Sequence, residues 1–353
     1  MFAQDVKGRR FFPLDLKLKL RTDHWSEGAA RVATRQGLQS KSFDKAAEAY
    51  SDATGGSMSG DSVRRITEGF GQKLEEKRER EAQQAYDPIQ PQTAQQVVTV
   101  SAPIQNQANV STDSGTVLVR GEGWKEFKMS VFSQVRIKPT TTHPTEAACD
   151  PHITLCGHSY QVGLWNADQM GQHQYLEGAR RQVERCARLG SANDGAPWIN
   201  RITTTNYRQI VYSIDWAHAR GRISNVAKSA FGDDTPLAQQ WDQQQVELLW
   251  HGRVEEVVTA LHSLDWEQIA CIEDIRNSPT YFETRKAYMD YARLRQEGYP
   301  IGSGTVESGI NTVVHHRMKR QGRGWKRTHA QAMMAALGEL HSNRFQLAWH
   351  AIG

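Results

Sequence analysis

Three acidic residues of this 353-residue chain lie far apart in the sequence, and each stands in a context suited to binding a metal ion. They are Asp113 in VSTDSGTVLV, Asp194 in SANDGAPWIN and Glu307 in GSGTVESGIN. Carboxylate oxygens are the ligands that Mg²⁺ prefers, and one or two carboxylates per ion suffice where phosphate and water complete the coordination. If the three residues converge, they form a divalent-metal centre for phosphodiester chemistry.

The sequence that follows Glu307 is strongly basic. The 31 residues from Ser308 to Gly338 include six Lys or Arg and no Asp or Glu. These cations are Arg317, Lys319, Arg320, Arg323, Lys326 and Arg327. We expect them to contact the phosphates of a nucleic acid, with an affinity that depends on salt and not on base sequence. Trp325 lies among them and is expected either to stack on an unpaired base or to anchor the helix.

A long final helix, from about Thr305, is expected to carry both Glu307 and the basic residues. Apolar residues recur in it at helical spacing and would dock on a sheet. They are Val306, Ile310, Val313 or Val314, and Met318. Glu307, Asn311 and His315 share an adjacent polar face, which aims Glu307 toward the metals. Asn311 and His315 would then line a DNA groove, or would simply be solvated.

The segment before this helix predicts a mixed α/β fold. WKEFKMSVFSQVRI alternates apolar and polar residues, which predicts a half-buried strand with antiparallel neighbours. Strands at Val110–Asp113 and Thr116–Arg120, flanking a Ser-Gly break, and at Ile153–Leu164 would complete a meander.

Helices and a further strand are predicted after the meander. Ala167–Leu189 favours a helix, a turn-rich piece ends at Asp194, and another helix begins within APWINRI. Arg208–Ile214 is β-prone and leads into Asp215 and a helix from about Trp216. From Ser224 to Gly298 the apolar spacing is helical throughout.

The N-terminal 86 residues predict a helical region. The expected helices are Trp25–Arg35, Phe43–Ala53 and Ser62–Tyr86. A glycine-containing turn joins the last two, as in a helix-turn-helix, so Arg64 and Arg65 would reach DNA if the third helix is a recognition helix. An ordinary helical domain is the alternative. The Gln- and Pro-rich stretch 87–109 predicts a linker.

The order of these elements matches a ribonuclease H-like fold, in which acidic residues lie on the first strand, after the fourth strand and on a late helix. The expected domains are a helical, helix-turn-helix-like region (1–86), the linker (87–109), a core (110–223 and 299–353) and an all-helical insertion (224–298).

Three segments, NDGAPWI, IDWAHA and GSGTVESGINTVVHHRMKRQGRGW, resemble DDE transposases of bacterial insertion sequences, in particular the ISKra type within the Mutator-like superfamily. The resemblance implies an enzyme that cleaves DNA at element ends and joins the freed ends to target DNA. It implies that Asp113, Asp194 and Glu307 bind Mg²⁺, for which Mn²⁺ can substitute. It also implies that the partners are double-stranded DNA and further copies of the chain.

Asp215 competes with Asp194 for the second carboxylate, because Asp215 ends a clearer strand than the LGSAN that precedes Asp194. In related transposases an Asp-x-x-His pattern, matched here by Asp215 and His218, follows the catalytic aspartate as an accessory element. We therefore assign Asp194 as the ligand. His218 would orient Asp215 or contact a phosphate, or would be a packed histidine at a helix start.

A zinc site is not expected. Cys149, His152, Cys156 and His158 lie close together in CDPHITLCGH, but their spacing matches no reliable zinc motif. The four cysteines of the chain, without a disulfide-rich pattern, fit a reducing cytosol. Since no segment approaches the roughly 18 apolar residues of a membrane helix, we expect a cytoplasmic, nucleoid-associated protein that does not bind membranes.

Two alternatives to a transposase remain open. One is a catalytically inactive or truncated transposase-derived protein that only binds DNA. The other is a ribonuclease H-like nuclease that cuts without joining. The net charge of +4 is modest, so a nucleic-acid partner is inferred from the clustering of basic residues at both ends of the chain. The presence of all three acidic residues favours an enzyme.

Overall fold

The computed structural model describes residues 3–4, 10–11, 25–86, 98–138 and 150–352. Near the N-terminus, β1 (Ala3–Gln4) and β2 (Arg10–Phe11) form a short antiparallel pair. The rest of the described chain is built around one sheet of five strands. Residues 87–97 of the predicted linker lie outside the described residues, whereas residues 98–109 are described, and Val98 and Ile104 among them are buried against the sheet and its helices.

The central sheet is mixed. Its strands are β3 (Gln107–Val119), β4 (Gly123–Lys138), β5 (His152–Gly163), β6 (Arg188–Asn193) and β7 (Val211–Ile214). They lie in the order β5-β4-β3-β6-β7. The first three form the antiparallel meander that the sequence predicts. β6 and β7 are added parallel to β3, which confirms the mixed α/β class.

Three predictions about these strands are wrong. The predicted Ser-Gly break does not exist, because β3 runs without interruption from Gln107 to Val119. β4 is buried on both faces from Phe127 to Ser133, since helices cover both sides of the sheet, so it is not half-buried. Arg188–Asn193 is the strand β6, where the end of a helix and a turn-rich piece were predicted. Small residues there fit between β3 and β7.

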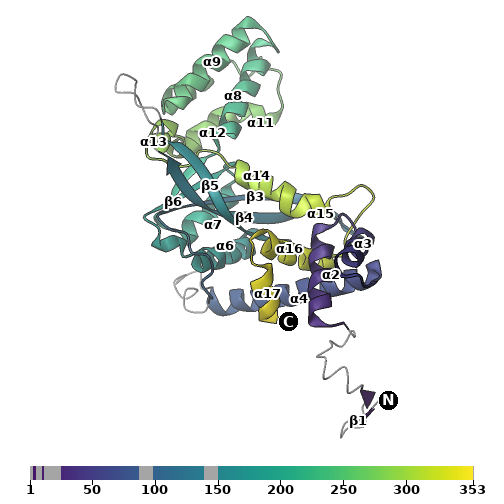
Figure 1. Ribbon diagram of the computed structural model, residues 1–353. Coiled ribbons are helices and arrows are strands. Elements are labelled where there is room, and N and C mark those ends of the chain that lie inside the picture. Colours follow the sequence, from purple (N-terminus) through teal and green to yellow (C-terminus); the bar gives the residue numbers. More distant parts are fainter. Residues whose placement is uncertain (1–2, 5–9, 12–24, 87–97, 139–149, 353) are drawn as a thin grey trace.

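Helices cover both faces of the sheet. On one face, α6 (Ala167–Arg181) packs against β4 and β5, followed by the 3₁₀ turn η2 (Val183–Arg185) and α7 (Pro197–Asn206). On the other lie α14 (Gly304–Gly309), the π-helical turn η4 (Ile310–His315) and α15 (His316–Met318), with α16 (Arg327–His341) against β5 (Figure 1). The terminal helix α17 (Phe345–Ile352) packs on α16 and α4.

The N-terminal helices belong to the same hydrophobic core as the sheet. They are α2 (Glu27–Gln39), α3 (Phe43–Thr54) and α4 (Gly60–Ala85), as predicted. The side chains of Ser26, Ser42 and Ser59 cap them by accepting backbone N–H bonds. α4 lies so close to α16 that a Cβ at Gly71 would come within 2.1 Å of the Ala332 carbonyl oxygen.

Residues 224–298 are helical, as predicted, and form a second core beside the sheet. The elements from Trp216 onward are α8 (Trp216–Phe231), α9 (Pro236–Trp250), α10 (Val254–His262), α11 (Glu273–Arg276), α12 (Ser278–Arg285), η3 (Lys286–Tyr288) and α13 (Tyr291–Gln296). They extend away from the end of the sheet that lies near α14 (Figure 1). Within the described ranges, none of the helices has the length and apolarity needed to cross a membrane.

The single long C-terminal helix that the sequence predicts is interrupted. It ends at Met318, and α16 begins only at Arg327, after a segment in which Gly322 has a φ of +72°. The segment is fixed to the end of β3, because Trp325 N–H donates to Leu118 and Arg120 N–H donates to the Trp325 carbonyl. The π-helical turn of η4 adds a residue to the helix, which is why both Val313 and Val314 are buried.

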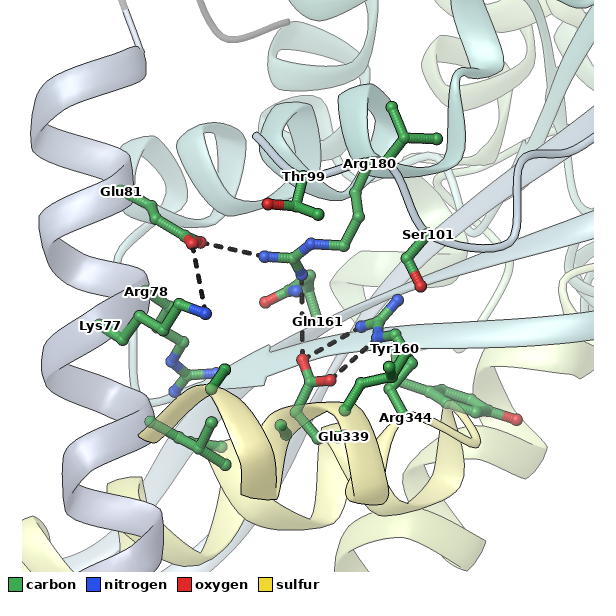
Figure 2. Close-up of a pocket in the computed structure, with 17 residues that line it drawn as sticks. Lys77, Arg78, Glu81, Thr99, Ser101, Tyr160, Gln161, Arg180, Glu339 and Arg344 are labelled. Carbon is green, nitrogen blue, oxygen red and sulfur yellow. Dashed lines mark hydrogen bonds and ion pairs between the residues drawn. The ribbon is translucent and has the colours of Figure 1, made fainter. Parts of the chain in front are cut away.

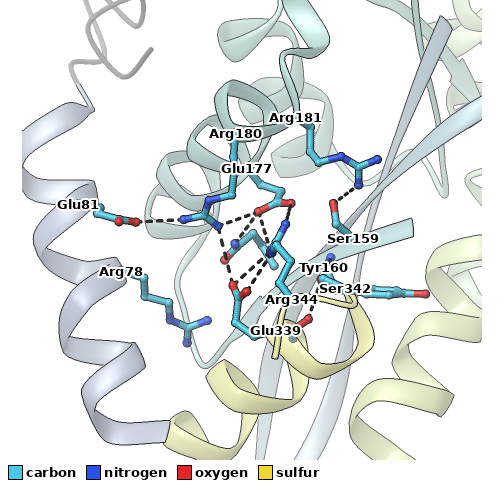
Figure 3. A network of polar contacts seen from close by, with 12 residues as sticks. Arg78, Glu81, Ser159, Tyr160, Glu177, Arg180, Arg181, Glu339, Ser342 and Arg344 are labelled. Atoms are coloured by element: carbon cyan, nitrogen blue, oxygen red, sulfur yellow. Dashed lines mark hydrogen bonds and ion pairs between the residues drawn. The ribbon is translucent and has the colours of Figure 1, made fainter. Parts of the chain in front are cut away.

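A buried network of ion pairs joins α4, α6, α16 and the chain before α17 (Figure 3). Glu177 is fully buried and accepts hydrogen bonds from Arg344 at 2.6 and 3.1 Å and from Arg180 at 3.0 Å. Glu339 also pairs with Arg344, and Glu81 pairs with Arg180. A cavity of about 310 Å³ lies beside this network (Figure 2). Four of the charged side chains labelled in Figure 2 are paired with one another, namely Glu81, Arg180, Glu339 and Arg344.

Candidate metal and nucleic-acid site

Three aspartates occupy equivalent positions on neighbouring parallel strands. β3 pairs with β6 in a register that matches Asn109 with Gly190, and β6 pairs with β7 in a register that matches Asn193 with Ile214. When both registers are continued toward the carboxyl ends of the strands, Asp113 lies opposite Asp194, and Asp194 lies opposite Asp215. Asp113 lies within β3, whereas Asp194 and Asp215 directly follow β6 and β7. The carboxyl ends of parallel strands therefore bring these side chains to one edge.

Glu307 lies above this edge, in the first turn of α14. The helix begins at Gly304, one residue before the predicted start at about Thr305. Ser303 Oγ donates to Glu307 Oε1 at 3.2 Å. Val306 and Ile310 are buried under the helix, as predicted, while Glu307 itself is exposed.

Two glycines allow this helix to approach the sheet closely. A Cβ at Gly115 would lie 2.6 Å from the Phe127 ring and 3.1 Å from Ile310. A Cβ at Gly309 would lie 3.0 Å from the Tyr160 ring and 3.1 Å from the Met129 sulfur. These contacts are tighter than ordinary van der Waals packing. Glycine at both positions thus sets the height of Glu307 over β3 and β4.

Asp215 is buried and caps α8. Its Oδ1 accepts hydrogen bonds from the backbone N–H of His218 at 2.7 Å and is 3.0 Å from His218 Nδ1. Its Oδ2 accepts the N–H of Ser303 at 2.5 Å. Burial alone would raise the pKa of this carboxyl group, but the bonds from His218 and Ser303 outweigh burial and lower the pKa to about 2. The hydrogen bond that the His218 ring donates to Asp215 raises the pKa of His218.

The acidic groups lie close enough to affect one another. Asp215, His218 and Glu307 each offer one atom that could bind a metal ion, and these three atoms lie within 4.8 Å of one another. Burial, followed by the negative charges of Asp194 and Glu307, raises the pKa of Asp113 to about 6. Asp113 and Asp194 do not belong to this group of three, but the charge of Asp194 acts on both Asp113 and His218. A cluster of negative charge with one perturbed carboxyl group is the electrostatic setting expected of a cation site.

The loop that carries Asp194 is held by helix α12. Asp194 Oδ1 accepts the N–H of Ala196 at 2.9 Å, which forms a tight turn. Tyr281 Oη donates to the Asp194 carbonyl at 3.4 Å, and Arg285 Nε donates to the Gly195 carbonyl at 3.1 Å. Gly195 has a φ of +90°, which glycine adopts without strain. The helical region therefore positions the second aspartate.

Sequence reasoning missed Ser303, Tyr281 and Arg285. Ser303 carried a local signal, because it lies in the GSG that begins the Glu307 helix and serine is a common helix cap. Tyr281 and Arg285 lie in an ordinary helical stretch without a motif. Only the three-dimensional packing of α12 against the Asp194 loop reveals them.

The two accessory residues on the C-terminal helix differ in their surroundings. Asn311 is exposed, and its Oδ1 lies 3.2 Å from His315 Nδ1. His315 Nε2 lies 3.2 Å from the Thr116 carbonyl oxygen, and the ring contacts Phe127 edge to face. His315 therefore links η4 to β3, whereas Asn311 remains at the surface next to Glu307.

Most of the predicted phosphate-contacting residues lie at the surface, but Arg317 does not. It is 2% exposed, its Nε donates to the Gly37 carbonyl, and its guanidinium lies over the rings of Phe43 and Trp325. Trp325 is also buried and donates from Nε1 to the Met318 carbonyl, so it anchors the chain. Both side chains therefore pack inside the fold and do not lie on an open helix face.

The remaining basic residues differ in the kind of group that they contact within the protein. Arg320 and Arg323 donate to the carbonyl oxygens of His316 and Lys41, and Arg327 pairs with Glu122. Lys319 lies 5.6 Å from the centre of the Trp124 ring, and Lys326 is exposed. The first turns of α4 carry Arg64, which pairs with Asp61 and Glu68, and Arg65, which pairs with Asp61.

The described members of the cysteine and histidine cluster do not form a metal site. Cys156 Sγ donates to the Gln134 carbonyl and His158 Nδ1 lies 2.8 Å from Ser133 Oγ, while His152 is exposed. Cys149 lies outside the described residues. Among the residues that the structure does describe, the group of three possible ligands is Asp215, His218 and Glu307.

No protein-family model matches the chain, and no curated protein matches it significantly.

Proposed function

We propose that this protein is a metal-dependent DNA transposase with a ribonuclease H-like core. The observation that carries the proposal is the convergence of Asp113, Asp194, Asp215 and Glu307 from three adjacent strand positions and one helix. The sheet order, with an antiparallel meander extended by two parallel strands, supports the assignment of the core. The motif around Glu307 supports transposition in particular.

The donor set fits a hard divalent cation such as Mg²⁺ or Mn²⁺. The groups are carboxylates, and the charges of Asp194 and Glu307 both act on Asp113. We assign these three as the residues that would hold the metal. Asp215 is the weaker choice, because its two oxygens already accept hydrogen bonds from His218 and Ser303. When bound, such ions activate the attacking oxygen and stabilise the leaving oxygen in displacement at phosphorus.

The other residues of the site have positioning roles in this proposal. Asp215 holds the imidazole of His218 through Nδ1, so that Nε2 can face the acidic groups or a phosphate. Ser303 directs Glu307 by its hydroxyl group and connects it to Asp215 by its N–H. Arg285 and Tyr281 hold the Asp194 loop. Rigid support of this kind keeps reacting groups in a productive geometry.

Replacement of Glu307 tests the proposal. DNA that flanks the gene is incubated with the protein and Mg²⁺, and cleaved and joined products are separated by gel electrophoresis. Glu307→Gln should reduce cleavage by on the order of 100-fold or more while leaving DNA binding intact. Glu297→Gln, which removes an exposed partner of Arg293, is the control. Undiminished cleavage by Glu307→Gln would refute the site, and cleavage without joining would indicate a nuclease.

A further inference from the structure

A second polar cavity lies at the far end of the α14–α15 segment, between the starts of α3 and α4 and the chain that follows α15. Its volume is about 560 Å³. Phe43, Arg64, Arg120, Arg317 and Trp325 are among its lining residues. Figure 1 shows α15 ending beside α2 and α3, and the bond from Arg317 Nε to the Gly37 carbonyl at 2.9 Å fixes this contact. We refer to this cavity as the Arg317 recess.

Arg317 is an unusual cation to find in such a position. Its side chain is 2% exposed, and its guanidinium carbon lies 4.5 Å from the centre of the Phe43 ring and 5.4 Å from that of Trp325. Within the described chain, its Nη2 is buried and lacks a hydrogen-bond partner. A buried donor that is left unsatisfied costs stability, and more so when it is charged. The recess therefore contains a donor suited to an anion.

The cations of the recess outnumber the available anions. Arg120 and Arg323 donate to the carbonyl oxygens of Gly324 and Lys41, and Lys326 is exposed. Within the part of the chain that the structure describes, none of these three, nor Arg317, has a carboxylate partner.

The acidic residues of the recess are already engaged. Asp61 pairs with Arg64 and Arg65, and Glu68 pairs with Arg64 and His329. The carboxylate of Asp44 lies against the N-terminus of α4, since a Cβ at Gly60 would lie 2.2 Å from Asp44 Oδ1. These acids neutralise Arg64 and the end of α4, and among the described residues Glu68 acts on Arg317 only through its charge, without forming an ion pair with it.

We propose that the Arg317 recess binds one phosphate group of a DNA strand, held by Arg317, Arg323 and Lys326. Guanidinium groups form short, charge-assisted hydrogen bonds with phosphate oxygens. Arg317 follows Glu307 by ten residues in the helical segment, which corresponds to about 15 Å at the rise per residue of an α-helix. This inference rests on the proposed function for the identity of the strand. Phosphate binding itself requires no cleavage.

Phosphate titration of the metal-free protein tests this site. Thermal unfolding is followed with increasing inorganic phosphate, against chloride at the same ionic strength, in the presence of a chelator. The wild type should be stabilised specifically by phosphate. The double variant Arg323→Gln/Lys326→Gln should weaken phosphate binding by about tenfold, since it removes two exposed cationic contacts. Arg327→Gln is the matched control, because Arg327 is exposed, adjacent to Lys326 and paired with Glu122.

A second arm identifies the source of the phosphate. Short duplexes with and without a 5′-phosphate are titrated into wild type and the double variant. Tighter binding of the phosphorylated duplex would assign the recess to a strand end, and equal binding that the double variant weakens would assign it to an internal phosphate. Equal phosphate affinity in wild type, double variant and Arg327→Gln would overturn the inference. These titrations contain no metal ion and measure binding without cleavage. Their outcome is therefore independent of whether Glu307→Gln abolishes catalysis.

Arg317 itself is tested by Arg317→Lys. The substitution keeps the positive charge but removes the guanidinium donors that face the recess. Phosphate affinity should fall while the protein remains folded, as judged by circular dichroism. A folded Arg317→Lys protein that binds phosphate as tightly as the wild type would exclude Arg317 from the site.

Discussion

Asp215 and Ser303 are joined by a hydrogen bond of 2.5 Å from the Ser303 N–H to Asp215 Oδ2, although the helices α8 to α13 lie between them in the sequence. The bond fastens the end of β7 to the start of α14. Ser303 then donates from its hydroxyl group to Glu307. The long helical region can therefore extend away from the sheet without displacing Glu307 from the aspartates. This arrangement makes Asp215 a positioning residue as much as a candidate ligand.

Asp215→Asn should uncouple these groups. An asparagine amide offers one acceptor oxygen in place of two, so the N–H groups of His218 and Ser303 cannot both keep their bonds. Since the hydrogen bond from the His218 ring to the Asp215 carboxylate raises the pKa of His218, the substitution should lower that pKa, which NMR titration of the imidazole measures. DNA cleavage should fall by roughly 10- to 100-fold with DNA affinity retained. The control is Asp233→Asn, at an exposed pair with Lys228. An unchanged His218 titration would contradict this account.

Asp113→Asn should stabilise the metal-free protein at neutral pH. The pKa of Asp113 is raised from its ordinary value of 3.8 to about 6, so ionisation costs the folded state free energy as the pH rises through this interval. Because asparagine does not ionise, the substitution should raise the free energy of unfolding by about 1–2 kcal/mol, a value that allows for the partial exposure of Asp113 to solvent. Urea unfolding in a chelator measures the difference, which should disappear below pH 3.8. A neutral or destabilising effect above pH 6 would contradict the raised pKa that burial and the neighbouring charges give Asp113.

The elements with strong local patterns were predictable from the sequence. The alternation through Phe127, Met129 and Val131 fixes β4, and the apolar spacing of Val306, Ile310 and Met318 fixes the helix that carries Glu307. β6 was not predictable, because its RLGSAN sequence has little intrinsic preference for a strand. Pairing with β3 and β7 imposes the extended conformation, and a Cβ at Gly190 would lie 3.0 Å from the Tyr299 ring.

Burial of charged residues was the main feature that local sequence could not reveal. Arg317 has the spacing of a solvent-facing residue in a basic helix, but its aromatic neighbours Phe43 and Trp325 come from distant segments. The same is true of Glu177 and Arg344, which meet only when α6 packs near the start of α17. By contrast, the acidic residues of the candidate site were visible in the sequence, because Asp194 and Asp215 directly follow β-strands, Glu307 lies in the first turn of a helix, and Asp113 lies in a β-prone segment.

Glu177→Gln should destabilise the fold strongly. It leaves Arg344 and Arg180 buried without a full counter-charge, at a cost of about 3–5 kcal/mol. Burial would raise the pKa of Glu177, but Arg344 and Arg180 outweigh it and lower the pKa to about 2. The stabilisation is therefore complete above the ordinary pKa of 4.5 and is lost as the pH falls toward 2.

Urea unfolding at neutral pH and across that acidic interval measures the loss. Glu283→Gln, at an exposed pair with Lys286, serves as the control and should cost less than about 1 kcal/mol. If the two variants lose similar stability, the network of Figure 3 does not hold the helices together.

Two glycines of α4 provide a matched test of how the N-terminal helices attach to the sheet. A Cβ at Gly71 would meet the Ala332 carbonyl oxygen at 2.1 Å, whereas a Cβ at Gly69 would meet nothing within 4 Å. Gly69→Ala should therefore stabilise the protein by about 0.5–1 kcal/mol, since alanine favours the helix. Gly71→Ala gains the same preference but forces α4 away from α16, with a net loss of about 1–3 kcal/mol. Thermal and urea unfolding measure both effects. Because both substitutions lie on one helix, a shared direction of change would show that α4 does not pack on α16 as closely as the structure places it.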